Sequence, residues 1–339
     1  MNGKWQQFLG TRGARMEAGT VTDFGDPAGE LAAARDATVL CPLLQSGLIA
    51  CAGDDARTFL HNQLTSDVNH LGTDAAQYST WCSPKGRMLA SFIVCRDAAG
   101  LLLLLSADLQ EFIQKRLQMY VLRSKVKIAS RSDDHAVLGL SGPQADAALH
   151  GAGLPVPAQP MQTGDFPSGK VIRLDASRFL VIAAGESAAP LWTTLAATAR
   201  PAGTPAWRWL DIRAGIPWVV DATREAFVPQ MANFDKIGGV SFHKGCYPGQ
   251  EVVARTQYLG KVKRHLYRFH ADGPITPGMP VFPAETPEQP CGMVANAAPS
   301  PAGGHDGLAV MLEGPLASGG TIRQDGRSLP LADIVAVGD

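Results

Sequence analysis

The 339-residue sequence lacks any Cys-x-x-Cys pair, although it contains cysteines at positions 41, 51, 82, 95, 246 and 291. Thiols scattered in this way argue against a zinc ribbon, a self-contained iron-sulfur site and a disulfide framework. Long apolar runs are missing too: stretches such as Leu101–Leu105 are far too short to cross a bilayer, and the N-terminus has no apolar signal-peptide core. We therefore predict a cytoplasmic protein with no membrane contact and no metal site of its own.

Signatures of several common functions are also absent. The sequence contains no G-x-x-x-x-G-K-[ST], no H-E-x-x-H and no RNP-like aromatic pair, so P-loop, zinc-protease and RRM interpretations are dropped. Its net charge of −1 predicts no general attraction to polyanions. Charge is unevenly distributed, however, because residues 236–270 carry seven lysines and arginines against one acid, Glu251. We interpret this basic segment either as a solvated face or as a docking surface for an anionic partner.

What is present fits a globular protein of more than one domain. The chain exceeds the usual size of one hydrophobic core, and its 45% hydrophobic and 18% charged residues suffice for sizeable cores. Strand and helix signals recur in two similar stretches, whereas residues 1–30 are predicted to form an irregular arm. From residue 262 the pattern changes to short strands punctuated by proline and glycine, which is typical of a small β-barrel.

Local signals predict three elements with particular clarity. Residues 54–64 begin with a capping acid and carry apolar residues at helical spacing, which predicts a short helix. Residues 78–82 and 88–95 predict a hairpin that is joined through Ser-Pro-Lys-Gly-Arg. Ser106 is predicted to cap a helix that follows a central strand.

The densest group of special residues is the segment 244–251, Lys-Gly-Cys-Tyr-Pro-Gly-Gln-Glu. Two glycines that permit positive φ and a proline that fixes its own φ predict a rigid turn here. Residues 250–259 then permit a helix that ends at Gly260. Cys246 would lie just before the N-terminus of that helix, where positive potential favours a thiolate.

With FDKIGGVSF before it and ARTQYLGKVKR after it, this segment resembles the signature of the YgfZ-type folate-binding proteins, relatives of the glycine-cleavage T-protein, the aminomethyltransferase GcvT. The resemblance implies an α+β fold: a GcvT-like folate-binding body of two related α+β subdomains, followed by a small C-terminal β-barrel. It also implies a role in making or maintaining iron-sulfur enzymes, including those that thiolate tRNA. The implied cofactor is tetrahydrofolate or a derivative, polyglutamates included.

The division predicted from these signals has four segments. Residues 1–130 form an N-terminal folate-binding subdomain that residues 206–261 complete, and residues 131–205 form a second α+β subdomain. Residues 206–261 also hold the signature segment, and residues 262–339 form the C-terminal β-barrel.

The chain departs from the pattern of its T-protein relatives at three matched elements. Ser66 replaces asparagine in an element similar to L-x-N-D-V, and Arg213 occupies the acidic position of R-L-E-A-G. On the second hairpin strand, the two carboxylates of the relatives fall on Ala90 and Ser91. Neither a methyl nor a hydroxyl group can hold charge beside a developing cation, so we predict a protein without enzymatic turnover.

Eleven residues are candidates for the functional site. Cys246 is predicted to be a reactive thiol with Lys244 as its cationic partner, the alternative for Cys246 being a small buried hydrophobe. The others are predicted to contact folate: Asp67, Lys85, Arg87, Arg213, Asn233, Tyr247, Gln250, Glu251 and Arg255. Asp67 has an alternative as a turn residue, Glu251 as a helix-capping group, and Lys85 and Arg87 as solvated surface residues.

We therefore interpret the chain as a folate-binding protein that supports assembly or repair of iron-sulfur enzymes through Cys246, with those enzymes or assembly proteins as partners. Two alternatives stay open. One is a folate-dependent aminomethyltransferase or demethylase, which an assay of one-carbon transfer distinguishes. The other is an RNA-binding module that uses residues 236–270, whose affinity for RNA would fall steeply with added salt.

Overall fold

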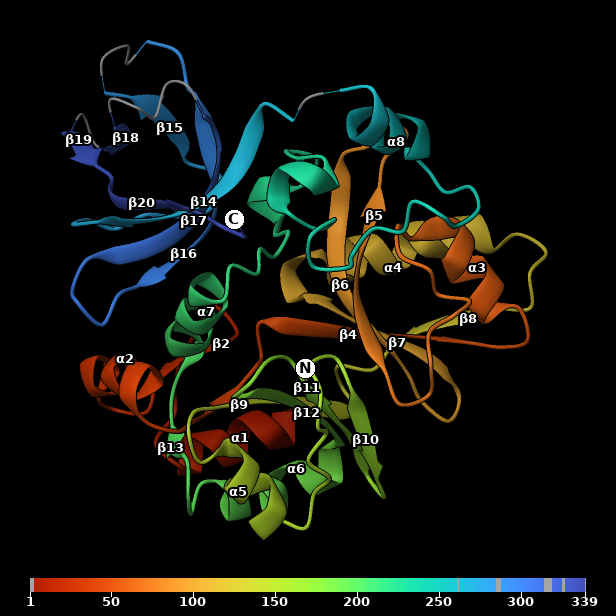
Figure 1. Cartoon of the computed structure of the whole chain (residues 1–339). Helices are drawn as coiled ribbons and strands as arrows, with labels where there is room; N and C mark the ends of the chain where they lie inside the picture. Colours follow the sequence, from red (N-terminus) through yellow and green to blue (C-terminus); the bar gives the residue numbers. More distant parts are fainter. Residues whose placement is uncertain (1–2, 261, 285–287, 314–318, 325–326, 339) are drawn as a thin grey trace. The chain divides into compact units, whose positions relative to one another are not determined.

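The structure is a computed structural model, and it describes residues 3–260, 262–284, 288–313, 319–324 and 327–338 (Figure 1). Its contacts group the chain into two units. The first unit comprises residues 1–59, 69–77 and 93–207, and the second comprises residues 60–68, 78–92 and 208–339. The second unit therefore combines a helix exit, a hairpin tip and the signature segment, which lie far apart in the sequence.

The first unit contains a six-stranded sheet in the order β10-β11-β12-β9-β3-β13. Its strands are β3 (Val39–Pro42), β9 (His135–Ser141), β10 (Thr163–Phe166), β11 (Gly169–Arg173), β12 (Arg178–Ala184) and β13 (Arg200–Pro201). Helices α1 (Gly3–Thr11), α5 (Ala145–Gly151) and α6 (Gly185–Leu195) lie together against this sheet (Figure 1). Leu140 of β9 and Phe179 of β12 are paired across the two strands, so they point to the same side of the sheet, where they pack with Trp5 and Trp192.

The irregular arm predicted over residues 1–30 is wrong, because the structure has regular elements there. After α1 come a hairpin of β1 (Arg15–Glu17) and β2 (Thr20–Asp23) and then the start of α2 (Pro27–Asp36). Trp5 and Leu9, one helical turn apart, are the buried residues of α1. The Asp26 side chain accepts a hydrogen bond from the Gly29 amide and so caps α2. Packing of two large side chains outweighs a local sequence that is rich in glycine.

A second sheet has five strands in the order β5-β6-β7-β4-β8. Its strands are β4 (Ser46–Ala52), β5 (Ala76–Cys82), β6 (Met88–Arg96), β7 (Gly100–Ser106) and β8 (Lys127–Ser130). Helix α4 (Ala107–Val121) contacts β4, β7 and β8, with Leu109, Ile113 and Leu117 as its buried residues. The hairpin and the helix after Ser106 are confirmed, although the Ser106 side chain makes no capping hydrogen bond. The short helix α3 (Ala56–Gln63) is confirmed as well.

The second unit carries a seven-stranded sheet in the order β19-β18-β15-β16-β17-β14-β20, which curls into a small barrel (Figure 1). Its strands are β14 (Arg264–Ala271), β15 (Pro280–Pro283), β16 (Gly292–Pro299), β17 (His305–Leu312), β18 (Gly320–Gln324), β19 (Arg327–Pro330) and β20 (Ala332–Ala336). Phe269, Val281, Val294 and Met311 form part of its core. The barrel predicted from residue 262 onward is therefore confirmed.

The remaining elements connect these sheets. They are α7 (Thr204–Arg213), the 3-10 turns η1 (Asp221–Thr223) and η2 (Pro229–Ala232), and α8 (Gln250–Tyr258). Helix α8 confirms the helix predicted after the signature segment, with Leu259 at its C-cap. Within the described ranges, no helix combines the length and the apolar character that spanning a membrane requires.

Candidate functional site

The signature segment is anchored to the turn that follows α3. The Thr65 hydroxyl donates a hydrogen bond to the Gly239 carbonyl at 2.6 Å, and the Ser241 amide donates to the Thr65 carbonyl at 2.9 Å. Thr65 is fully buried, so both bonds lie out of water. The chain therefore enters the signature segment from a fixed position.

Lys244 is buried, and its ammonium group caps the end of α3. It donates hydrogen bonds to the carbonyl oxygens of His61 and Leu64, the second at 2.5 Å. The last carbonyls of a helix lack partners within the helix and carry partial negative charge, so a cation is favoured there. Burial nevertheless lowers the pKa of Lys244 from 10.5 to about 8, while the Asp67 carboxylate acts in the opposite direction. Lys244 thus holds the segment to α3 at an electrostatic cost.

Two further side chains complete this cluster around Lys244. The Tyr247 ring is buried, and its centroid lies 4.9 Å from the Lys244 Nζ, which is a cation–π distance. Burial raises the pKa of the Tyr247 phenol, and proximity to Cys82 adds to the effect. Asp67 Oδ1 lies 3.2 Å from His61 Nδ1. The structure therefore brings together three predicted residues, Asp67, Lys244 and Tyr247, with His61 between them.

The hairpin tip and the start of α8 are in backbone contact, which only glycine permits. Gly249 has φ 82°, and a Cβ atom there would lie 2.5 Å from the Ser83 carbonyl oxygen and 2.8 Å from the Gly86 Cα. Gly86 has φ 70°, and its Cβ atom would lie 2.8 Å from the Val252 Cβ. Glycine is the residue that takes positive φ without a steric cost. The chain is therefore tightly packed against the hairpin tip on the C-terminal side of Cys246.

Cys246 is exposed, whereas the other cysteines, 41, 51, 82, 95 and 291, are buried; all six lie in the described ranges. Burial raises the pKa of the Cys51, Cys82 and Cys95 thiols to about 12. Cys246 lies four residues before Gln250, the first residue of α8. The structure thus presents one thiol to solvent, near the positive end of a helix.

Five other predicted residues lie on the hairpin tip and on α8. Lys85 and Arg87 are exposed at the tip, and Arg87 donates a hydrogen bond to the Ala226 carbonyl. Glu251 and Arg255 are exposed on α8, with Glu251 in the first turn, where a carboxylate is favoured by the helix dipole. Gln250, the first residue of the helix, is half-buried.

Asn233 and Arg213 lie elsewhere in the second unit. Asn233 ends η2 in the left-handed conformation, with φ 59°, and its buried side-chain amide donates to the Val337 carbonyl at 2.6 Å. Arg213 is exposed at the end of α7, and its guanidinium carbon lies 5.8 Å from the centroid of the Trp209 ring. Among the described residues, no hydrogen bond, ion pair or ring contact joins either side chain to Lys244 or Tyr247.

Comparison with known proteins identifies the family. Residues 21–184 match the family described as the GCVT N-terminal domain. The chain is 34% identical over 248 residues to the tRNA-modifying protein YgfZ of Cronobacter sakazakii, an alignment that covers 73% of the chain and 75% of that relative. The chain belongs to the YgfZ family. The resemblance that the signature segment indicated is thereby confirmed.

Other relatives agree with the YgfZ assignment. The tRNA-modifying protein YgfZ of Sodalis glossinidius is 35% identical over 222 residues, which cover 65% of the chain and 67% of that relative. The glycine cleavage system aminomethyltransferase T of Bartonella henselae superposes with a TM-score of 0.74 at 19% identity, over 96% of the chain and 94% of that structure. At this identity the likeness concerns the fold, and it confirms the α+β, GcvT-like architecture with its terminal barrel.

The two positions where the relatives of the YgfZ family carry carboxylates are closed inside the fold. Ala90 and Ser91 lie on β6 and are buried. The Ser91 Oγ accepts a hydrogen bond from the Val219 amide at 2.9 Å. This hydroxyl therefore has a structural role, which is to hold the segment before η1 against β6.

Sequence reasoning missed the buried hydroxyl groups that join the turn after α3 to β5. The Ser66 hydroxyl donates to the Ser79 Oγ at 2.7 Å, and the hydroxyls of Thr65 and Thr80 are 3.0 Å apart. His61 was missed as well, although its carbonyl receives Lys244. The only signal in the sequence is the concentration of serine and threonine at 65–66 and 79–80. Of these residues, Thr65 joins the hydroxyl cluster to the chain that enters the signature segment, through its bonds to Gly239 and Ser241.

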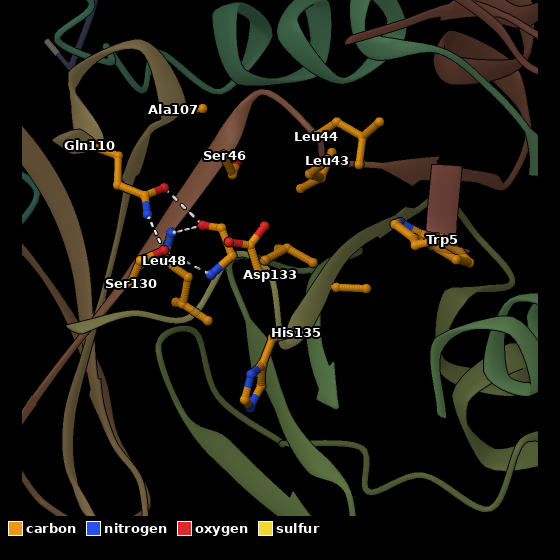
Figure 2. A pocket seen from close by; sticks show the side chains of 13 residues that line it. Trp5, Leu43, Leu44, Ser46, Leu48, Ala107, Gln110, Ser130, Asp133 and His135 are labelled. Carbon is orange, nitrogen blue, oxygen red and sulfur yellow. Dashed lines mark hydrogen bonds between the residues drawn. The ribbon is translucent and has the colours of Figure 1, made fainter. Parts of the chain in front are cut away.

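A cavity of about 290 Å³ lies within the first unit, and none of the predicted site residues lines it (Figure 2). Gln110, Ser130 and Ser132 form its polar side, where the Gln110 Nε2 donates to the Ser130 Oγ at 2.7 Å and the Ser132 Oγ donates to the Gln110 Oε1 at 2.8 Å. Trp5 and Leu43 are among its apolar residues. Gln110, Ser130 and Ser132 therefore bond to one another on this side of the cavity.

Proposed function

We propose that this protein binds a reduced folate and supports the assembly or repair of iron-sulfur enzymes, including tRNA-thiolating ones, through the thiol of Cys246. The observation that carries the proposal is the exposure of this one cysteine on a turn built from contacting glycine backbones. A merely packed cysteine needs neither exposure nor such a turn. The YgfZ relatives are tRNA-modifying proteins, which supports a role in the same process.

The chemistry proposed for the site depends on which of its side chains are accessible from solvent. A thiolate attacks disulfides and binds soft metals, and both reactions need the disulfide or the metal to reach the sulfur. Cys246 meets that condition because it is exposed. We assign Lys244 to positioning the turn, since its ammonium donates to the carbonyls of His61 and Leu64. No turnover at a substrate carbon is needed for either reaction.

The residues present fit a folate as a bound ligand, not as a carbon donor in transfer. The exposed cations Lys85 and Arg87 suit the carboxylates of a folate glutamate tail, and the Asp67 carboxylate, near His61 and Lys244, offers an acceptor. The buried positions Ala90 and Ser91 offer no carboxylate for one-carbon chemistry. We therefore propose tetrahydrofolate or a polyglutamate derivative as the ligand.

Calorimetry tests the folate part of the proposal. We expect tetrahydrofolate to bind, its polyglutamates to bind more tightly, and the Lys85→Ala variant with Arg87→Ala to lose the advantage of the polyglutamate while it keeps the affinity for the monoglutamate. The matched control is Lys115→Ala, which removes an exposed lysine from α4. Absence of binding by the unaltered chain would refute the folate assignment.

Complementation tests the thiol part. In cells that lack their own YgfZ protein, the unaltered chain should restore the activity of iron-sulfur enzymes and of tRNA thiolation, and Cys246→Ser should not. The control Cys291→Ser removes a buried thiol of the barrel core and should still restore activity, provided that the variant accumulates. Restoration by Cys246→Ser would show that the thiol is dispensable.

RNA binding is a second candidate, since part of the basic segment is exposed beside an aromatic ring. Tyr258 is 65% exposed at the end of α8, and Arg255 on the same helix is exposed. Aromatic rings and cations side by side suit single-stranded RNA. An affinity for RNA that persists at physiological salt and depends on both residues would favour this function.

A further inference from the structure

The C-terminal end of α4 places large apolar side chains in water. Met119 is 67% exposed and Leu122 is 88% exposed, while Tyr120 between them is 41% exposed. The helix buries its opposite side through Leu109, Ile113 and Leu117. Exposed single apolar residues are common, but three within four residues form a patch, and such patches mark interaction sites.

The backbone of Leu122 adopts an unfavourable conformation although its side chain is not packed against the fold. It follows the last residue of α4 with φ 46°, where glycine is the favoured residue. A leucine in this conformation carries backbone strain, and its exposed side chain gains nothing from burial in return. Fold stability therefore does not explain a leucine at this position.

The same stretch is strongly basic. From Lys115 to Lys127 the sequence has five lysines and arginines and no acid. Lys115 pairs with Glu111 at 2.5 Å, and Lys125 approaches Asp54 at 3.4 Å. Arg123 and Lys127 are exposed and have no ion pair within the described chain.

We propose that this surface, formed by Met119, Tyr120, Leu122, Arg123 and Lys127, docks an acidic segment of a partner protein that also carries apolar side chains. Carboxylates of the partner meet Arg123 and Lys127, and its apolar side chains cover Met119 and Leu122. RNA is disfavoured as the occupant, because bases stack on aromatic rings, and here the two most exposed apolar side chains, Met119 and Leu122, are not aromatic. The surface belongs to the first unit, so this inference goes beyond the role of Cys246.

The proposal is tested by fluorescence anisotropy with the full chain and three labelled probes of equal length: an amphipathic peptide with glutamates and leucines at helical spacing, the same peptide with serine in place of leucine, and single-stranded RNA. We expect the amphipathic acidic peptide to bind most tightly. Tighter binding of the RNA, or equal binding of the two peptides, would overturn the proposal.

Two variants make the test specific to this surface. Leu122→Gly should lower the affinity for the amphipathic peptide about tenfold while the melting temperature stays unchanged or rises, because glycine relieves the strain. Arg123→Glu should weaken the same complex about tenfold at low salt, and less as salt is added. The control Leu259→Ser removes an equally exposed leucine from the end of α8 and should change nothing. Unchanged binding in Leu122→Gly would refute the docking role.

Discussion

The first part of strand β6, residues 88–92, and the signature segment both belong to the second unit, but their polar side chains differ in exposure. On β6, Ser91 is buried and its hydroxyl accepts the Val219 amide, while Ala90 beside it offers no polar group. In the signature segment, Cys246 is exposed, and the residues beneath it, Lys244 and Tyr247, are buried. A side chain reacts with another molecule only if that molecule reaches it. Of these two regions, only the signature segment presents a nucleophilic side chain to solvent, which is what the proposed function requires, whereas Ser91 of β6 has a structural contact.

The largest expected effect comes from filling the backbone contact that supports the signature turn. Gly249→Ala places a Cβ atom 2.5 Å from the Ser83 carbonyl oxygen at φ 82°. Left-handed strain and overpacking together should lower the free energy of unfolding by roughly 3 kcal/mol. Urea denaturation followed by circular dichroism measures this loss.

The matched control for Gly249 lies four residues earlier in the same segment. Gly245 is exposed, and a Cβ atom there would meet only the His61 Nε2 at 4.0 Å. Gly245→Ala should therefore change the free energy of unfolding by less than about 0.5 kcal/mol. Similar losses in both variants would mean that the turn does not depend on the contact between Gly249 and the hairpin tip.

The second effect concerns Lys244 and depends on pH. Lys244→Met removes the donor to two carbonyl oxygens and should destabilise the fold by about 1 to 3 kcal/mol at neutral pH. The folded pKa of about 8 lies below the ordinary 10.5, so between these values the unfolded chain binds more protons and the unaltered protein becomes more stable as pH rises. The deficit of the methionine variant should therefore widen from pH 8 to 10.5.

Denaturant titrations at several pH values measure that widening. The control is Lys85→Met, which removes an exposed lysine of the hairpin tip. Its effect on the free energy of unfolding should stay flat over the same pH range. A deficit of Lys244→Met that shrinks above pH 8 would contradict the assignment of a buried, hydrogen-bonded ammonium.

The third effect tests whether β6 is framework alone. Ser91→Ala leaves the buried Val219 amide without its acceptor and should cost about 1 to 3 kcal/mol of unfolding free energy. The double variant Ala90→Asp with Ser91→Asp should restore no aminomethyl transfer to tetrahydrofolate, because it buries carboxylates without cationic partners. Measurable transfer by the double variant would show that β6 can still support the chemistry.

The sequence predicts well what depends on neighbouring residues. Helix α8, the hairpin of β5 and β6, and the C-terminal barrel all follow from glycine, proline and apolar spacing within short windows. The structure of residues 1–30 could not be predicted in this way. Helix α1 is stabilised by Trp5, whose ring centroid lies 5.8 Å from that of Trp192, a residue far away in the sequence. Distant packing decides the structure where local signals are weak.

In the candidate site, too, the sequence predicts what depends on neighbouring residues and misses contacts with distant ones. The exposed thiol and the rigid turn are expected from the segment 244–251 alone, yet the acceptors of Lys244 lie 183 and 180 residues earlier in the chain. No local pattern indicates that the ammonium turns inward to α3. Asn233 illustrates the opposite error, because a polar residue that suits a ligand contact instead donates to the Val337 carbonyl at 2.6 Å.

The smallest expected effect on stability is that of Cys246→Ser, although this substitution removes the thiol that we expect to be the most reactive. Cys246→Ser should change the free energy of unfolding by less than about 0.5 kcal/mol, because the exposed hydroxyl stays hydrated. Alkylation by iodoacetamide at neutral pH, followed by peptide mass spectrometry, should modify Cys246 first. Burial raises the pKa of Cys82 from 9.0 to about 12, so its thiolate is about a thousandfold scarcer than that of an ordinary thiol. If Cys246→Ser melts early and Cys82 is alkylated as fast as Cys246, the thiol is packing, and the contrast between β6 and the signature segment does not hold.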